Sequence, residues 1–486
     1  MKNITDRILD FKSLERKVFD LAMQIGREVI QDYLFNLDKE IMALRDTSEY
    51  RAVNSETTAI KSLMGEITYT RRRYKVKSGG YVFLLDKVLG IGKGCGLISE
   101  NLAEQIIVEC TDKSFRKASE SINNLTGQKI SAMGAWGVLQ RFSGKLEKQE
   151  ERLSELHQSG VDGQLGNLSR QVIFSEFDDV WLRMQREKRI KKGELAEAGR
   201  KKTGKKPMHI GTAYSGWGRT KDGKHRLLDK FAYASFGTSG KFASDFKMLL
   251  HHRFDMDGIE RFVVNGDGAK WIKTAAEENN AILQLDPFHR SRAILRAVAD
   301  KADRAMLFDA IKEKDVNKAL TIIADLITKA SDEQSRKKLG DLFGYFHSNR
   351  DTLLTWQERD VKLPNPPEGV EYRSLGTQES SNCDLITQRM KHRKGSWSES
   401  GANNMAKILC LRNTIGVDAV LGILPPPPQA TDSPCPLSAA KAPFYDGKGF
   451  AGNIAPMPFE GVFKTFGRAA IRGLVQLRHH SDLKFI

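Results

Sequence analysis

Two short apolar runs that each end at an acid, within residues 261–290, constrain the fold more than any other feature of this chain. The first run, residues 262–264, is apolar and largely β-branched without helical spacing. A glycine-flanked Asp267 follows it, so it predicts a buried strand with this acid at its carboxyl end. Helix-forming residues then lead to a second apolar run that ends at Asp286. Such a strand–helix–strand unit is a βα crossover, and sheets built from these units carry functional groups at strand ends.

Two distant segments supply further acids. Residues 171–185 alternate between apolar and polar and predict a strand, so Asp178 and Asp179 point to opposite faces and only one can face a site. Downstream, a run that opens Thr-Gln-Glu turns helical and places Glu379 in a first helical turn. Gathering Asp178, Asp267 and Glu379 costs Coulomb repulsion, which a divalent cation relieves. Three carboxylates with two Mg²⁺ or Mn²⁺ ions suit in-line displacement at a phosphodiester.

Longer motifs surround these acids. They read SEFDDVW, VVNGDGAKWI, LDPFHRSRAI, GTQESSN followed by RMKHRKGSWSESGA, and, in the amino-terminal half, GEITYTRRRYKVKSGGYVFLLDKVLG. Together they resemble the Lre-type insertion-sequence transposases of bacteria, which are relatives of the Mutator-like DDE transposases. The resemblance implies a ribonuclease-H-like core, a helical insertion before the last acid, and DNA strand-transfer activity. It assigns the first acid to Asp178, although Asp179 stands where the family pattern has glycine.

The charge balance favours a polyanionic partner. The 486 residues carry 77 Lys and Arg against 61 Asp and Glu, a net charge of +16, and neutralising phosphates with such an excess releases counterions. A merely basic soluble enzyme has the same composition, so this alternative stays open. The length is sufficient for several domains with a sizeable core.

Cysteine spacing and hydropathy argue against a zinc-binding, disulfide-rich or membrane-spanning protein. The five cysteines form no CxxC pair or His-spaced cluster, so neither a zinc site nor a disulfide framework is indicated. No signal peptide opens the chain and no run of ~18 apolar residues occurs, so we expect a cytoplasmic, nucleoid-associated protein without a membrane segment.

The amino-terminal half begins with an amphipathic helix over residues 13–44, either an arm for dimerisation or DNA-end binding or a helix that only packs on the next domain. A hairpin follows around residues 77–80, and its first strand carries Arg71, Arg72 and Arg73. A rigid basic hairpin can clamp phosphate, whereas a solvated face is the commoner explanation of such a run.

Residues 114–146 read as a helix-turn-helix. An amphipathic helix ends at Leu125, a Gly-containing turn follows, and Ser131 caps a second helix. Gln140 and Arg141 on that second helix are candidates for contact with bases or phosphates. Any helical hairpin has this pattern, so simple packing is the alternative.

Residues 186–206 are dense in Lys and Arg and almost devoid of core residues, which predicts an exposed loop with Lys191, Lys192, Lys201 and Lys202 near the first acid. This loop either holds DNA or only makes the protein more soluble. The loop interrupts a predicted hairpin, and the strand order that we expect is ribonuclease-H-like. Its three antiparallel strands are residues 171–185, 208–215 and 225–236, and two parallel strands follow near residues 262 and 282.

Residues 291–356 have helical spacing over a length too great for a simple crossover, which predicts an all-helical insertion. Beyond the last acid, Arg389, Lys391 and Arg393 are basic, and Trp397 either stacks on an extruded base or is a half-buried structural residue.

Close to the first two acids, Lys270 would neutralise phosphate. His289 contacts the scissile phosphate, orients Asp267, or is structural. Asp286 is an alternative metal ligand because it ends the neighbouring strand.

The fold that we expect is α/β: a ribonuclease-H-like mixed sheet with a helical insertion, plus a mainly helical amino-terminal region that contains the β-hairpin and the helix-turn-helix-like segment. The expected division is residues 1–60 helical arm, 61–165 DNA-binding region, 166–290 first part of the catalytic core, 291–368 helical insertion, 369–412 second part of the core, and 413–486 Pro-rich linker and C-terminal helix.

The expected function is a DDE-type DNA transposase. Asp178, Asp267 and Glu379 would hold the two metal ions, with His289 beside them, for cleavage at the ends of an insertion sequence and strand transfer to target DNA. Double-stranded DNA and a homodimer or larger homo-oligomer are the expected partners. A nuclease or resolvase on the same fold, or a transposase-derived DNA-binding regulator without catalysis, remain the alternatives.

Overall fold

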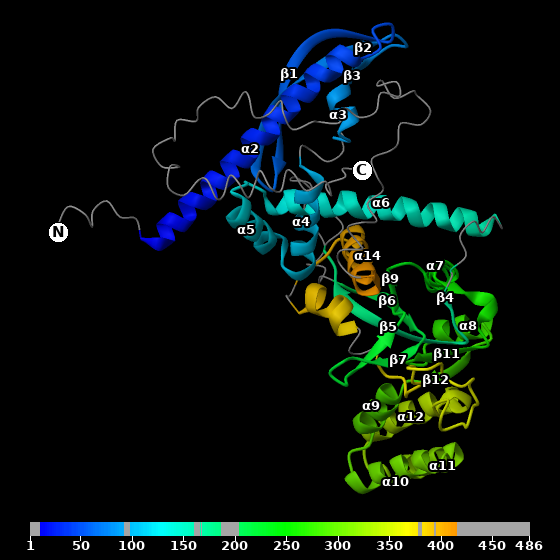
Figure 1. The fold of residues 1–486 in the computed structure, drawn as a ribbon. Coiled ribbons are helices and arrows are strands. Elements are labelled where there is room, and N and C mark those ends of the chain that lie inside the picture. The colour runs from blue at the N-terminus through cyan, green and yellow to red at the C-terminus, as the bar shows by residue number, and fades with distance from the viewer. Residues whose placement is uncertain are drawn as a thin grey trace, which may run out of the picture.

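The computed structural model describes residues 10–91, 98–159, 166, 168–185, 204–377, 382–392 and 395–415 (Figure 1). Several predictions lie outside these residues: the third acid Glu379, Arg393, the basic loop with Lys191, Lys192, Lys201 and Lys202, and nearly all of the C-terminal tail. The described chain is a mixed α/β protein, as the sequence predicted. No described helix is long and apolar enough to cross a membrane.

The amino-terminal unit is a long helix laid against a three-stranded antiparallel sheet (Figure 1). Its elements are α2 (Phe11–Leu44), β1 (Tyr50–Ser62), β2 (Gly65–Val76), β3 (Tyr81–Phe83) and α3 (Leu84–Val88). The long helix and the β2–β3 hairpin were predicted. Strand β1 was not, and it crosses the boundary proposed at residue 60, because its polar residues hide the alternation and only pairing with β2 reveals it.

Three helices follow: α4 (Glu100–Asp112), α5 (Phe115–Thr126) and α6 (Ala132–Gln158). Gly127 ends α5 in the left-handed region, with φ of 67°, and Ser131 Oγ accepts a hydrogen bond from Gly134 N near the start of α6. The predicted helix–turn–helix is therefore present as local structure. Its apolar face, including Leu139 and Phe142, is buried in a cluster that also contains Leu182 of the central sheet, so this cluster crosses the boundary proposed at residue 165.

The central sheet has the strand order β12-β11-β5-β6-β9. Strand β5 pairs antiparallel with β6, and β6 antiparallel with β9, whereas β11 pairs in parallel with both β5 and β12. The strands are β5 (Val172–Arg183), β6 (Lys205–Tyr214), β9 (Phe231–Ser235), β11 (Arg261–Gly266) and β12 (Ile282–Leu285), with short strands β4 (Leu168–Ser169) and β10 (Phe254–Asp255) paired beside it.

The predicted third strand is shorter than expected. Only β9 joins the sheet, because the chain turns at Asp229, whose φ is positive at 52°. The residues before this turn form β8 (His225–Leu228), which pairs with β7 (Gly216–Arg219) in a separate two-stranded ribbon.

Helices cover both faces of the sheet. On one face, α7 (Ser239–His251) and α8 (Lys270–Glu278) bury Phe177 and its neighbours. On the other face, α6 and α14 (Glu399–Ile415) bury Val180 and Leu182. Strand β5 therefore alternates between two cores, which explains its nearly unbroken burial.

Helices fill most of the predicted insertion, whereas its last residues, 353–368, are turns and irregular structure. The helices are α9 (Pro287–Ala297), α10 (Lys301–Lys312), α11 (Val316–Lys329) and α12 (Glu333–Ser348), and short 3₁₀ turns lie elsewhere at Met256–Gly258 and Arg350–Thr352. These helices have their own apolar cluster, which includes Leu285 at the end of β12, and they stand beyond that edge of the sheet (Figure 1). The chain then returns to the sheet through an irregular segment and a π-helical segment, Cys383–Lys391.

Candidate active site

The sheet register brings the carboxyl ends of β11 and β12 level with the middle of β5. Asn265 on β11 pairs with Glu176 on β5, and Gly266 pairs with Leu285 on β12. Two residues beyond the first pair are Asp267 and Asp178, and one residue beyond Leu285 is Asp286. The two acids that the sequence singled out on separate segments therefore meet at adjacent strands, as a parallel β11–β5 pair requires.

Asp178 lies partly buried on the face that also carries Glu176. Its Oδ2 accepts a hydrogen bond from Asn382 Nδ2 at 2.6 Å, and its Oδ1 accepts from the backbone N–H of Asp179 at 2.7 Å. Burial raises the pKa of Asp178 to about 6, and the negative charge of Asp267 adds to this rise while His289 opposes it. These interactions place Asp267 and His289 in the electrostatic neighbourhood of Asp178.

Asp179 faces the opposite side of β5, as the period of two predicts. His209 Nδ1 lies 2.6 Å from its Oδ1, and the His209 ring contacts Trp271, with 4.8 Å between centroids. The choice of Asp178 over Asp179 as the acid that faces Asp267 is therefore the one that this geometry favours.

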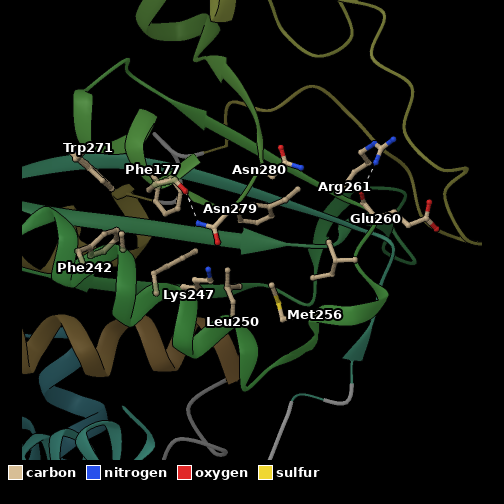
Figure 2. A pocket seen from close by; sticks show the side chains of 15 residues that line it. Phe177, Phe242, Lys247, Leu250, Met256, Glu260, Arg261, Trp271, Asn279 and Asn280 are labelled. Carbon is tan, nitrogen blue, oxygen red and sulfur yellow. Dashed lines mark hydrogen bonds between the residues drawn. The ribbon is translucent and has the colours of Figure 1, made fainter. Parts of the chain in front are cut away.

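A cavity of about 230 Å³ lies on the Asp179 side, between α7 and α8 (Figure 2). Phe177, Phe242 and Trp271 line its apolar wall, and Lys247 and Glu260 lie at its rim. None of the proposed acids lines this cavity, so we place the candidate site on the acidic face and not in the cavity.

Asp267 sits in a tight turn between β11 and α8. Its Oδ1 accepts from the backbone N–H of Ala269 at 2.9 Å, and its carbonyl accepts from the hydroxyl of Tyr345 at 2.8 Å. Gly268 has φ of +90°, and a Cβ there would lie 2.7 Å from Asn349 Oδ1, so this turn requires glycine. Helix α12 thus returns from the insertion to hold the loop of the second acid.

Asp286 and His289 begin helix α9. Asp286 is buried, caps the helix by accepting from Phe288 N at 2.8 Å, and also accepts from Asn265 Nδ2 at 3.2 Å. Its two oxygens thus serve the helix start and the neighbouring strand. His289, one turn into α9, is half-buried and interacts with the charge of Asp178.

Glu176 is a residue of the site that sequence reasoning missed. Its side chain is 0% exposed, and its carboxylate accepts from Tyr214 Oη at 2.6 Å, Asn265 Nδ2 at 3.0 Å and Gly376 N at 3.0 Å. Thr377 donates to it from both its backbone N–H and its hydroxyl. The available signal was a lone acid inside an apolar strand, since a fully buried carboxylate needs several donors.

The third proposed ligand, Glu379, lies outside the described residues. The described residues on either side of it are both tied to β5: Thr377 to Glu176, and Asn382 to Asp178. Among the described residues alone, no group of three or more His, Cys, Asp or Glu side chains could hold a metal ion. The described part therefore contributes Asp178 and Asp267 to the proposed set.

The three consecutive arginines of β2 are engaged within the amino-terminal unit. Arg71 pairs with Asp86, Arg72 with Asp38, and Arg73 with Glu56. Arg71 also lies over Phe83 and Arg73 over Tyr81. Arg71 and Arg72 therefore tie the small sheet to α3 and α2, whereas Arg73 links strands within the sheet. Their proposed contact with DNA stays a prediction.

The other predicted DNA contacts divide by burial. Arg389 is buried and donates to the carbonyl of Cys110 at 2.7 Å, and Trp397 is buried and donates to the carbonyl of Met390 at 3.0 Å. Arg389 thus ties the π-helical segment to α4, and Trp397 is buried in the apolar cluster that the amino-terminal helices share with the central sheet. Their proposed contacts with DNA stay predictions. Gln140 Oε1 accepts from Asn404 Nδ2 of α14, which leaves Arg141, Lys270 and Lys391 as the exposed members of the described set.

The described fold defines a mixed α/β protein in which acids just past the ends of β11 and β12 lie level with an acid on β5. Residues 4–420 match the family described as "Uncharacterised protein family (UPF0236)", and the chain belongs to this family. It is 24% identical over 407 residues to "UPF0236 protein in vanSb 3'region" of Streptococcus gallolyticus, covering 82% of this chain and 81% of that protein.

A second relative comes from Caldanaerobacter subterraneus. This UPF0236 protein is 22% identical over 418 residues, covering 84% of this chain and 80% of its own length, and its name joins eleven locus labels. Another UPF0236 protein of the same organism is 24% identical over 420 residues, and its name contains four locus labels.

Proposed function

We propose that this chain is a DDE-type DNA transposase that uses a ribonuclease-H-like core for metal-dependent cleavage and strand transfer at the ends of an insertion sequence. The observation that carries the proposal is the tethering of the third segment. Both flanks of Glu379 are tied to β5, Thr377 at Glu176 and Asn382 at Asp178, while Asp267 stands on the neighbouring strand. Three distant segments thus converge at one strand end, which supports assembly of three acids.

The topology supports the same proposal. Three antiparallel strands followed by two parallel ones, with the first acid on β5 and the second after β11, is the order that the sequence led us to expect of a ribonuclease-H-like core. The helical insertion lies between the second acid and the segment of the third, where the resemblance to Lre-type transposases places it.

The names of the relatives add independent support. One UPF0236 protein of Caldanaerobacter subterraneus carries eleven locus labels, and another carries four. Several loci for one protein in one genome are expected of a gene that copies itself to new positions, and they are not expected of an ordinary nuclease or regulator.

The residues present fit a divalent cation. Carboxylate oxygens are the ligands that Mg²⁺ and Mn²⁺ prefer. The negative charge of Asp267 adds to the rise in the pKa of Asp178, and a bound cation would offset this effect. Asp178, Asp267 and Glu379 would hold the ions. When bound, two such ions supply an activated water and charge stabilisation for in-line displacement at phosphorus.

The protein's own groups have separate tasks in this proposal. Asn382 fixes the rotamer of Asp178 by its 2.6 Å hydrogen bond, and Tyr345 holds the loop of Asp267. His289 is near enough to interact with Asp178 and would donate to a phosphate oxygen. Exposed Lys270 at the start of α8 would neutralise the flanking phosphate.

A cleavage assay on DNA that carries the element's own ends tests the proposal. With Mg²⁺ or Mn²⁺ the full chain should cut at the ends and join the freed 3′-hydroxyl to target DNA, and Asp267→Asn should do neither while it still binds. Cutting without joining would point to a nuclease or resolvase, and binding without either reaction would point to a regulator. Both outcomes would overturn the proposal.

A further inference from the structure

One exposed row of side chains on α9 starts at the proposed site. Phe288, Arg292, Leu295 and Arg296 recur at intervals of three and four residues, so they share one side of this helix, and we call them the α9 ridge. Phe288 is 43% exposed and Leu295 51% exposed, and both arginines are exposed. The opposite side, with Arg290 and Ile294, is buried against the insertion. Among the described residues, none covers the ridge.

The helix beneath the ridge is held at both ends. At its start, Asp286 caps it, and Arg290 forms hydrogen bonds to Glu358 through two guanidinium nitrogens, at 2.9 and 3.1 Å. At its end, Arg304 donates to the carbonyl of Val298 at 2.7 Å. A rigid helix presents its exposed groups in fixed positions, which is what a preorganised binding surface needs.

The chemistry of the ridge combines an aromatic ring with positive charge. The Arg292 guanidinium lies 5.7 Å from the centroid of the Phe288 ring. Within the described residues no ion pair engages Arg292 or Arg296, whereas Arg290 on the buried side is paired with Glu358. Helix α9 contains no acid of its own. A ring beside guanidinium groups suits a ligand that has both planar bases and phosphates.

We propose that the α9 ridge binds the DNA strand next to the reacting phosphodiester, with an unpaired base stacked on Phe288 and successive phosphates on Arg292 and Arg296. The proposal rests on the proposed function, because it takes its ligand from the site where α9 begins. Phe288 lies two residues beyond Asp286, and β12, which ends just before Asp286, is paired with β11, which leads to Asp267. A DNA strand on the ridge therefore runs toward these acids. The two arginines stand on the order of 6 Å apart along the helix axis, which allows each to reach its own phosphate.

Forked DNA provides the test. A short duplex with an unpaired fork, labelled with 2-aminopurine at the branch, is titrated with the full chain in EDTA, so that binding is measured without cleavage. Phe288→Ala should weaken binding of the fork about tenfold and remove the fluorescence change of the branch base, with little effect on a blunt duplex. The Arg292→Ala and Arg296→Ala pair should weaken both DNAs and lower the slope of log affinity against log salt by about two.

Matched controls lie on α10 of the same insertion. Phe308→Ala removes an exposed ring, and the Lys301→Ala and Lys312→Ala pair removes two exposed charges, all off the ridge. These variants should bind like the unaltered chain. All the changed side chains are exposed, so thermal melting should stay the same throughout.

The outcomes separate this proposal from the proposed function. If the ridge variants bind like the unaltered chain, or the α10 controls lose as much, the ridge proposal is overturned even when cleavage is normal. If the ridge variants alone lose binding but the unaltered chain never cleaves element ends with Mg²⁺, the ridge stands and the transposase proposal falls. If the unaltered chain binds neither DNA, both are overturned.

Discussion

The two faces of strand β5 differ in what their acids can do. On one face, Glu176 is enclosed by donors and Asp178 stands beside Asp267 and His289. On the other face, Asp179 is tied to His209 against an aromatic core. Asp178 and Asp179 are the same residue type and adjacent in sequence, but they have different neighbours. The comparison teaches that the groups facing each side of a strand, and not the residue type, decide the surroundings of an acid.

Deleting residues 10–158 should have the largest effect, because it removes the cover of the Asp178 face. Val180 and Leu182 are buried in one cluster with the amino-terminal helices. The deletion would expose these two residues and the rest of that cluster. The remaining core should therefore fail to fold cooperatively, and should not merely lose specific binding to DNA. Thermal melting and limited proteolysis measure this; a deletion product that melts cooperatively would show that the two parts are independent domains.

Asp178→Asn should lower cleavage more than about a hundredfold, since changes even to groups that only support metal ligands cost 10- to 100-fold. Asp179→Asn, on the opposite face, should cost less than about tenfold. Single-turnover cleavage with Mg²⁺ compares the two. Equal losses would show that the faces are not functionally separate.

Glu176→Gln should destabilise the fold and loosen the third segment. The amide places N–H donors opposite the donors of Gly376, Thr377 or Tyr214, and each unpaired buried group costs about 1–3 kcal/mol. Urea unfolding should show the loss, and cleavage should fall further than melting explains, because Glu379 lies only two residues beyond Thr377 in the sequence. Glu260→Gln, an exposed change near the cavity rim, is the control and should alter neither.

The stability of the metal-free protein should depend on pH through Asp178. Its pKa is raised from the ordinary value to about 6, so the folded state holds this proton more tightly than the unfolded state between about pH 4 and 6. Stability therefore falls as pH rises through this window, and Asp178→Asn lacks this loss, which is up to about 3 kcal/mol. Urea titrations of both proteins in EDTA measure the difference, which added Mg²⁺ should reduce. A difference that is constant from pH 4 to 7 would contradict the assignment.

His209→Gln should have the smallest effect. It removes the partner of Asp179 and should cost about 1 kcal/mol of stability, with cleavage close to that of the unaltered chain. Melting and cleavage are measured together. A loss of cleavage as large as that of Asp178→Asn would mean that the Asp179 face acts on the site through the strand.

Local periodicity made much of this fold predictable. The alternation over β5, the apolar runs of β11 and β12, the spacing in α9 to α12 and the glycine that ends α5 each act within a few residues. The length of each connection then indicated whether neighbouring strands are antiparallel or parallel, because a short turn joins antiparallel strands and a helical crossover joins parallel ones. Strand β1 was missed because it is polar on both sides, and its strand character depends on pairing with β2.

The acids followed from strand ends, but their surroundings did not. The sequence by itself determined that Asp178 and Asp179 face opposite ways, since side chains alternate along any strand. Only the tertiary structure decided that Glu176 holds the Thr377 segment and that Arg71, Arg72 and Arg73 are paired within their own unit. It also decided that no described residue forms an ion pair with Arg292 or Arg296. The reason is physical: periodicity is a property of neighbouring residues, whereas burial and pairing depend on groups that the fold brings together from distant parts of the chain.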